Sequence, residues 1–299
     1  MSILVVGSVA LDSIKTPFGE KKEILGGSAT FFSISASFFD KVNIIATVGG
    51  DFPKRYLRLL KDRKIGTAGI AVAKGKTFRW EGSYEYDMNV AHTLATHLNV
   101  FKYFSPEIPD ALKKSEVLFL ANIDPDLQES VLRQTGEPEL TACDSMNHWI
   151  TSKKSSLEKF LPKVDIFFLN DGEARQFTGE VNIFKAAKAI VAKGPKSVVI
   201  KKGEHGVVYY SRKTHFVAPA YPLESVYDPT GAGDTFAGGV IGYLGRAGKI
   251  TENVLRKSMV YGSIMASFAV EDFSVNRLLK ITRTDINRRY NEFKKLTRF

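Results

Sequence analysis

The chain has 299 residues, 44% of them hydrophobic, which allows one large domain with a substantial core, and no run of ~20 apolar residues predicts a membrane span. The single cysteine, Cys143, excludes an internal disulfide framework and favours a reducing, cytoplasmic location. The net charge of +10 comes from lysine and arginine residues spread along the chain, so the composition does not indicate a nucleic-acid-binding protein.

Short, continuous apolar runs alternate with helical patterns along the chain. Continuous runs are typical of parallel strands that are buried on both faces of a sheet. They lie at residues 3–6, 42–48, 117–120, 140–143, 166–169 and 198–200. The helical patterns lie at residues 28–39, 53–63, 127–134, 155–161, 172–177 and 183–192. This order predicts a single three-layer α/β/α domain over residues 1–299.

Two segments depart from this alternation. Residues 76–88 alternate aromatic and polar side chains, which indicates a hairpin with two distinct faces and a bend at Gly82. We expect strands at about 11–25 and 66–90 to form a small separate sheet. The charged segment 283–298 has Ile286 and Phe293 at helical spacing, which favours a solvated amphipathic helix over a nucleic-acid surface.

Residues 228–239 read Asp-Pro-Thr-Gly-Ala-Gly-Asp-Thr-Phe-Ala-Gly-Gly and carry the most chemistry. Gly231 and Gly233 let a ligand approach the main chain, and the small residues that follow predict a tightly packed helix. The free N–H groups of a helix N-terminus suit a phosphate or a developing anion. Asp234 has two interpretations, as the N-cap of an ordinary turn or as a base beside that anion site.

This segment resembles the C-terminal signature of the ribokinase-like (PfkB) carbohydrate kinases, Asp-Thr-x-Gly-Ala-Gly-Asp or a close variant. The resemblance implies a ribokinase-like, Rossmann-like core with a small β-sheet lid over the substrate, and it covers nearly the whole chain. It also implies that the amides of Gly231, Ala232 and Gly233 hold the transferred phosphoryl group while Asp234 takes the proton of the substrate hydroxyl. Asp228 and Thr230 would be oxygen donors for K⁺, which some members bind.

The nucleotide side of the resemblance rests on two further motifs. Asn170 and Glu173 directly follow an apolar strand, at the sheet edge where ligands gather in open α/β folds. They match the Asn-x-x-Glu motif, which implies that Glu173 holds Mg²⁺ through water, and Asp171 would cap the local helix. Lys201, Gly203 and Gly206 resemble the segment that contacts the phosphates of ATP, although most members have Thr where Lys201 stands.

On the substrate side, Asp12 resembles the carboxylate that grips substrate hydroxyls, and Gly26 and Gly27 match the paired glycines that let the backbone close on the sugar. Phe31 stands where ribokinases and adenosine kinases carry Asn; it cannot make that residue's hydrogen bonds, but it can stack on a ring. Arg79 would suit a carboxylate or phosphate on the substrate, or it is an ordinary surface-strand residue.

The sequence therefore predicts an ATP- and Mg²⁺-dependent phosphotransferase that acts on an alcohol group of a small sugar or sugar-like polyol. A nucleoside kinase of the same fold is the alternative, and a non-catalytic sugar or nucleotide sensor is disfavoured because Asp234 and its glycines are retained. We expect small-molecule partners only, without nucleic acid or membrane. A homodimer through the lid is expected from four aromatic residues: Phe78, Trp80, Tyr84 and Tyr86.

Overall fold

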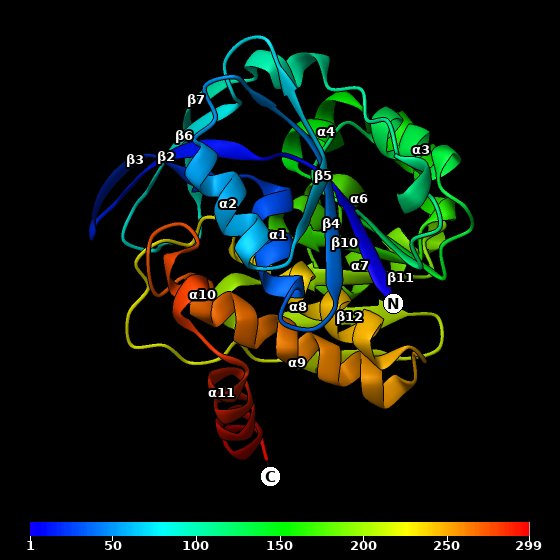
Figure 1. Ribbon diagram of the computed structural model, residues 1–299. Coiled ribbons are helices and arrows are strands. Elements are labelled where there is room, and N and C mark those ends of the chain that lie inside the picture. The colour runs from blue at the N-terminus through cyan, green and yellow to red at the C-terminus, as the bar shows by residue number, and fades with distance from the viewer. Residues whose placement is uncertain (299) are drawn as a thin grey trace.

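The computed structural model describes residues 1–298, and its centre is a large sheet (Figure 1). The order of its strands is β13-β12-β11-β10-β9-β8-β1-β4-β5, and β12 and β13 extend one edge in antiparallel fashion. The bounds are β1 Ser2–Val6, β4 Lys41–Gly49, β5 Gly66–Ala73, β8 Val117–Leu120, β9 Leu140–Asp144, β10 Ile166–Asn170, β11 Ser197–Lys201, β12 Val207–Ser211 and β13 His215–Ala218. All six predicted strands are present, and the seven strands from β11 to β5 in this order pair in parallel with one another.

Helices cover both faces of this sheet, which explains why its strands are continuous apolar runs (Figure 1). One face packs against α1 Ser28–Ala36, α2 Lys54–Asp62, α8 Ala232–Ala247, α9 Glu252–Ala269, α10 Asn276–Lys280 and α11 Arg283–Leu296. The other packs against α3 Pro125–Gln134, α4 Asn147–Ser152, α5 Lys154–Phe160, α6 Asp171–Thr178 and α7 Ile183–Ala192. The three-layer α/β/α prediction is confirmed.

Helix α8 lies very close to its neighbours because its buried face consists of small residues. A Cβ on Gly238 would lie 2.3 Å from the carbonyl oxygen of Phe32 in α1. A Cβ on Gly239 would lie 3.0 Å from the Cα of Gly262 in α9. Larger side chains would push the three helices apart, so these glycines fix where α8 begins relative to the sheet.

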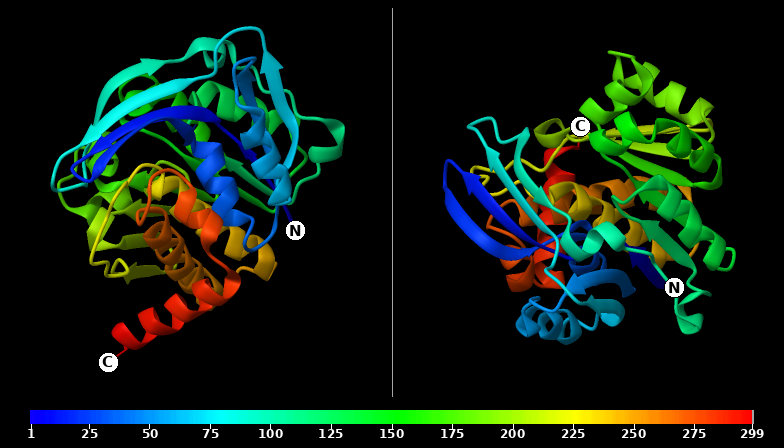
Figure 2. Two further views of the ribbon diagram at one scale, coloured as in Figure 1. Left: turned by 60° about the vertical axis from the view of Figure 1, so that its left-hand side comes forward. Right: turned by 90° about the horizontal axis from the view of Figure 1, so that it is seen from above.

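A second sheet with the strand order β3-β2-β6-β7 lies beside the large one (Figure 2), as expected. Its bounds are β2 Ala10–Thr16, β3 Gly19–Gly26, β6 Arg79–Tyr84 and β7 Ala91–His97. The expected boundaries need correction, because β5 pairs with β4 in the large sheet and β7 lies beyond residue 90. Gly82 is not the bend of the hairpin; it lies at an irregularity in β6, where a Cβ would collide with the ring of Trp80.

The chain ends in the predicted amphipathic helix, α11, which projects from the body in Figure 2. Ile286 and Phe293 are buried, and Thr282 and Asp285 form a capping box at its start. Of the four lid aromatics, Tyr86 is 90% exposed and the others are partly buried, so the homodimer stays a prediction. Among the described residues, no helix combines the length and the apolar character that crossing a bilayer requires.

Candidate active site

The loop before α8 presents free backbone amides. Gly231, the N-cap, has a φ of +74°, a left-handed conformation that favours glycine. The amide of Ala232 donates to the carbonyl oxygen of Pro229 at 3.1 Å. The amides of Gly231, Gly233 and Asp234 find no acceptor among residues 1–298. Gly231, Gly233 and Asp234 thus supply free donors where the anion site is expected, while the amide of Ala232 closes the turn, and anion binding there stays a prediction.

Asp234 lies in the first turn of α8 and is not the helix cap, because Gly231 occupies that position. Its residue is half-buried, so the carboxylate is not sealed inside the core. Burial and, to a smaller extent, the carboxylate of Asp144 raise the pKa of Asp234 to about 7, although the ammonium of Lys201 lowers it. A carboxyl group with a pKa near neutrality is suited to accept a proton.

Two further acids meet Lys201 at the carboxyl ends of neighbouring strands. Lys201 ends β11, and its Nζ lies 2.8 Å from Oδ2 of Asp144 at the end of β9. Burial raises the pKa of Glu173 to about 7, while Lys201 lowers it and Asp144 raises it. Burial lowers the pKa of Lys201 itself, but Asp144 and Glu173 raise it, and the net direction is upward.

Asn170 and Glu173 form a capping box at the start of α6. The amide of Asn170 donates to Oε2 of Glu173 at 2.7 Å, and the amide of Glu173 donates to Oδ1 of Asn170 at 2.7 Å. Asn170 is therefore the helix cap, and the expectation that Asp171 caps this helix is wrong; Asp171 pairs instead with Arg175. The other oxygen of Glu173 has no hydrogen-bond donor in the described part of the chain.

Asp12 and the two glycines meet where the lid joins the large sheet. A Cβ on Gly26 would lie 1.8 Å from Oδ2 of Asp12, so only glycine leaves room for this carboxylate. Gly27, with a φ of +95°, sits directly against the carbonyl oxygen of Ser8. Burial raises the pKa of Asp12 to about 8, Asp228 raises it as well, the Gly27 amide lowers it, and Asp234 adds a smaller upward effect.

Asp228 and Thr230 join the glycine loop to the turn after α9 and to lid strand β6. Oδ1 of Asp228 accepts from the amide of Thr230 at 2.9 Å, and Oδ2 accepts from the amide of Ser274 at 2.9 Å. The hydroxyl of Thr230 lies 3.2 Å from that of Tyr84, on lid strand β6. Both expected K⁺ ligands thus have protein partners, and cation binding there stays a prediction. Tyr84, which the sequence indicated only as a dimer contact, turns inward and joins the lid to this loop.

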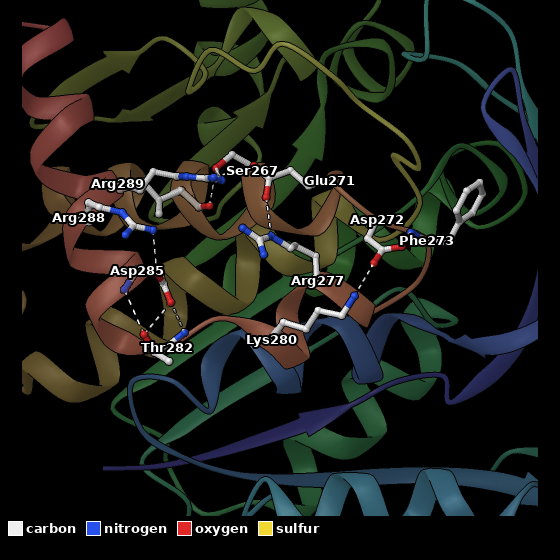
Figure 3. Close-up of polar contacts among 11 residues, drawn as sticks. Ser267, Glu271, Asp272, Phe273, Arg277, Lys280, Thr282, Asp285, Arg288 and Arg289 are labelled. Atoms are coloured by element: carbon white, nitrogen blue, oxygen red, sulfur yellow. Dashed lines mark hydrogen bonds and ion pairs between the residues drawn. The ribbon is translucent and has the colours of Figure 1, made fainter.

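Ion pairs fix the turn after α9 that carries Ser274 (Figure 3). Glu271 binds Nε of Arg277 at 2.8 Å and an Nη of Arg289 at 2.6 Å. Asp272 lies 3.3 Å from Nζ of Lys280. These pairs tie the turn to α10 and α11, so the C-terminal helices position the loop that contains Asp228.

The lid also contacts the loop between β11 and β12, where the nucleotide is expected. In the turn between β6 and β7, the side-chain amide of Asn89 donates to Oε1 of Glu204 at 3.0 Å. A Cβ on Gly203 would lie 2.6 Å from Oδ1 of Asn89. Gly203 and Gly206 have φ values of +54° and +86°, which shape the loop between β11 and β12 for this contact. These contacts join the small sheet to the loop between β11 and β12, and a cavity of about 670 Å³ lies along the sheet beside Tyr84.

Arg79 and Phe31, two of the expected substrate contacts, are already engaged by other groups of the protein. Arg79 pairs with Asp51, which follows β4, at 2.8 Å and with Glu23 of β3 at 2.7 Å, so its guanidinium is already neutralised by two acids of the protein. Phe31 is 1% exposed, and its ring lies directly beneath Gly231. Phe31 supports the glycine loop, and stacking on a substrate ring would require it to move.

Known proteins resemble this chain over nearly its whole length. Residues 5–281 match the pfkB family of carbohydrate kinases. The cytidine kinase of Thermococcus kodakarensis is 29% identical over 259 residues, which are 85% of this chain and 92% of that protein. The nucleoside kinase of Methanothermobacter thermautotrophicus is 27% identical over 290 residues, 90% of this chain and 89% of that protein. A putative ribokinase II from E. coli, solved with ATP and Mg²⁺, has the same fold, with a TM-score of 0.80, 18% identity and coverage of 97% and 99% of the two chains.

Proposed function

Because this chain belongs to the pfkB family of carbohydrate kinases, it is a kinase, and we propose that it transfers the γ-phosphoryl group of ATP to a hydroxyl group of a nucleoside. The observation that carries the phosphoryl-transfer assignment is Asp234, whose half-buried carboxylate stands beside three backbone amides without protein acceptors. A carboxylate costs energy beside an anion site unless it takes part in the chemistry. A sensor that only binds its ligand has no need of this pairing.

The chain's own groups account for the transfer. Asp234 accepts the proton of the substrate hydroxyl as the oxygen attacks phosphorus. The free amides of Gly231, Gly233 and Asp234 donate to the phosphoryl oxygens, on which negative charge is spread in a loose transition state. The buried carboxyl group of Asp12 stands near Asp228 and Asp234, where a sugar hydroxyl has to be held. The lid excludes water through the contacts of Tyr84 and Asn89.

The residues around Glu173 fit a magnesium ion. The carboxylate of Asp144 raises the pKa values of both Glu173 and Asp234, and Lys201 is the cation that lowers both. A divalent cation would relieve this excess of negative charge, and the uncommitted oxygen of Glu173 can hold it through water, as Mg²⁺ prefers. When bound, Mg²⁺ supplies charge neutralisation on the β- and γ-phosphates. The E. coli putative ribokinase II, which has the same fold, was solved with ATP and Mg²⁺, and this favours the same two cofactors here.

A nucleoside is favoured as the acceptor because the two relatives named above, a cytidine kinase and a nucleoside kinase, match 85% and 90% of this chain. The paired state of Arg79 also argues against an acceptor that carries a carboxylate or phosphate, since such a group would have to displace Asp51 and Glu23. A small sugar is the second candidate, which the family's carbohydrate substrates favour.

The test is a coupled ADP-release assay with ATP and Mg²⁺, in which the purified protein is offered cytidine, uridine, adenosine, inosine, ribose, fructose, a sugar acid and an inositol. We expect turnover with at least one nucleoside at a kcat/KM well above that for any sugar, and mass spectrometry should show a nucleoside monophosphate. Turnover restricted to sugars would refute the nucleoside assignment. The absence of turnover with every acceptor, in a protein that binds ATP, would support the sensor alternative.

A further inference from the structure

Lys201 carries a buried positive charge into the glycine loop. Its side chain is 16% exposed, and its Nζ pairs with Asp144, whose side chain is 5% exposed. A Cβ on Gly233 would lie 3.1 Å from this Nζ, so the ammonium group lies against the backbone of the first turn of α8. The ammonium group therefore lies against the turn that holds the free amides, next to Asp234.

The pair with Asp144 does not by itself explain the position of this lysine. Burial of an ion pair stabilises a fold weakly or not at all, because the loss of hydration offsets the attraction between the charges. Three carboxylates from three elements face the ammonium group: Asp144 of β9, Glu173 of α6 and Asp234 of α8. Lys201 is one cation among three acids, and it lies beside a helix N-terminus with free donors. An anionic ligand at this point would be stabilised by the ammonium group and by the free amides together.

We propose that Lys201 is a catalytic residue whose ammonium group contacts the phosphoryl group during its transfer, and that Asp144 is a positioning residue that holds Lys201 in place. This proposal rests on the proposed kinase function. In the step, the bond between the substrate oxygen and the γ-phosphorus forms while the bond from that phosphorus to the β,γ-bridging oxygen breaks. The hydroxyl proton goes to Asp234, ADP leaves with the electron pair of the broken bond, and Lys201 transfers no proton.

The experiment compares the full-length protein with Lys201→Met, Lys201→Arg and Asp144→Asn. Lys196→Met is the matched control, because Lys196 lies just before the first residue of β11, at the end of the strand opposite Lys201, and its side chain is 81% exposed. Calorimetry measures the affinity for Mg²⁺–ADP alone and for Mg²⁺–ADP with aluminium fluoride, which mimics the phosphoryl group in flight. This readout needs no acceptor, and kcat and KM for ATP are measured separately with the best acceptor.

For Lys201→Met we expect a loss of about 10²-fold or more in both kcat and affinity for the aluminium fluoride complex, with little change in affinity for ADP alone. Lys201→Arg should keep part of both, because it keeps the charge. Asp144→Asn should lose about 10-fold, as is usual when the partner that orients a catalytic group is removed. The control should behave as the wild type does.

A second variant separates catalysis from charge neutralisation. Lys201→Met alone leaves Asp144 buried without its partner and can fail to fold for that reason. The double variant Lys201→Met/Asp144→Asn removes both charges, and we expect it to fold and to lose as much as Lys201→Met. Wild-type affinity for the aluminium fluoride complex in the double variant would overturn the proposal and leave Lys201 only the role of neutralising Asp144. A failure of nucleoside turnover in the wild type would refute the proposed acceptor without altering this binding comparison.

Discussion

Replacing Gly231 with Ala tests the geometry of the glycine loop. An Ala there would keep a φ near +74°, which costs about 1–2 kcal/mol for a residue with a Cβ. Its Cβ would also lie 2.4 Å from Cγ and Cδ2 of Phe31, which is 1% exposed and has no free space to enter. Such overpacking costs about 1–3 kcal/mol. We therefore expect Gly231→Ala to lower the free energy of unfolding by about 2–5 kcal/mol.

Urea denaturation of the wild type and of four variants measures both contributions; the variants are Gly231→Ala, Phe31→Ala, Gly231→Ala/Phe31→Ala and Gly179→Ala. Gly179→Ala is the matched control, because Gly179 also has a left-handed φ, +77°, but a Cβ there would meet no atom within 4 Å. It should lose only about 1–2 kcal/mol, the part due to backbone strain. In the double variant Gly231→Ala/Phe31→Ala the collision is absent, so its loss should be about 1–3 kcal/mol less than the sum of the single losses. If Gly231→Ala costs no more than Gly179→Ala, the close packing of Phe31 beneath the loop is refuted.

Three further predictions follow from the site and the lid. The kcat should rise with pH through about 7 as Asp234 ionises, measured with excess coupling enzyme, and a flat profile from pH 5.5 to 8.5 would exclude this carboxylate as the base. The pKa of Asp12 is about 8 in the folded protein and lower in the unfolded chain, so between these values only the native state holds the proton. The free energy of unfolding should therefore fall by up to about 1.4 kcal/mol per pH unit between pH 5 and 8. Asp12→Asn should remove this contribution in urea denaturation, and an unchanged slope would contradict the burial of Asp12. Asn89→Ala removes the hydrogen bond to Glu204 and should raise KM for the acceptor by less than about 10-fold while leaving the folding free energy nearly unchanged; a KM equal to that of wild type would show that this contact does not contribute to closure.

The parts of the fold that local pattern determines could be predicted from the sequence. Strands β8 and β10 are runs of apolar residues with no polar interruption, and helix α7 occupies the predicted range, 183–192. Strand β5 was assigned to the lid instead of the large sheet, because its sequence, Gly-Thr-Ala-Gly-Ile-Ala-Val-Ala, is small and half exposed. The pairing of β5 with β4 depends on tertiary structure, which no local sequence pattern indicates.

The candidate site divides in the same way. The glycines of residues 231–233 and the acid at 234 form a continuous motif, so their proximity was predictable. Contacts across the chain were not: Tyr84 reaches Thr230 over 146 residues, and Asn89 reaches Glu204 over 115. Tyr84 carried one signal, since a buried tyrosine needs a partner for its hydroxyl, but the sequence does not indicate which face of β6 is buried. The sequence predicted Asp171 as the cap of α6, but Asn170 is the cap because its side chain accepts a hydrogen bond from the amide of Glu173.

The central claim is that Asp234 takes the proton of the acceptor hydroxyl beside the glycine loop. The most direct measurement is the kcat of purified Asp234→Asn with the best nucleoside, alongside its affinity for Mg²⁺–ATP by calorimetry. We predict that kcat falls by several orders of magnitude, roughly 10²–10⁴-fold for the loss of a general base, while the variant folds and its ATP affinity stays within a few-fold of wild type. Turnover close to that of the wild type, in a folded variant that binds ATP normally, would contradict the account.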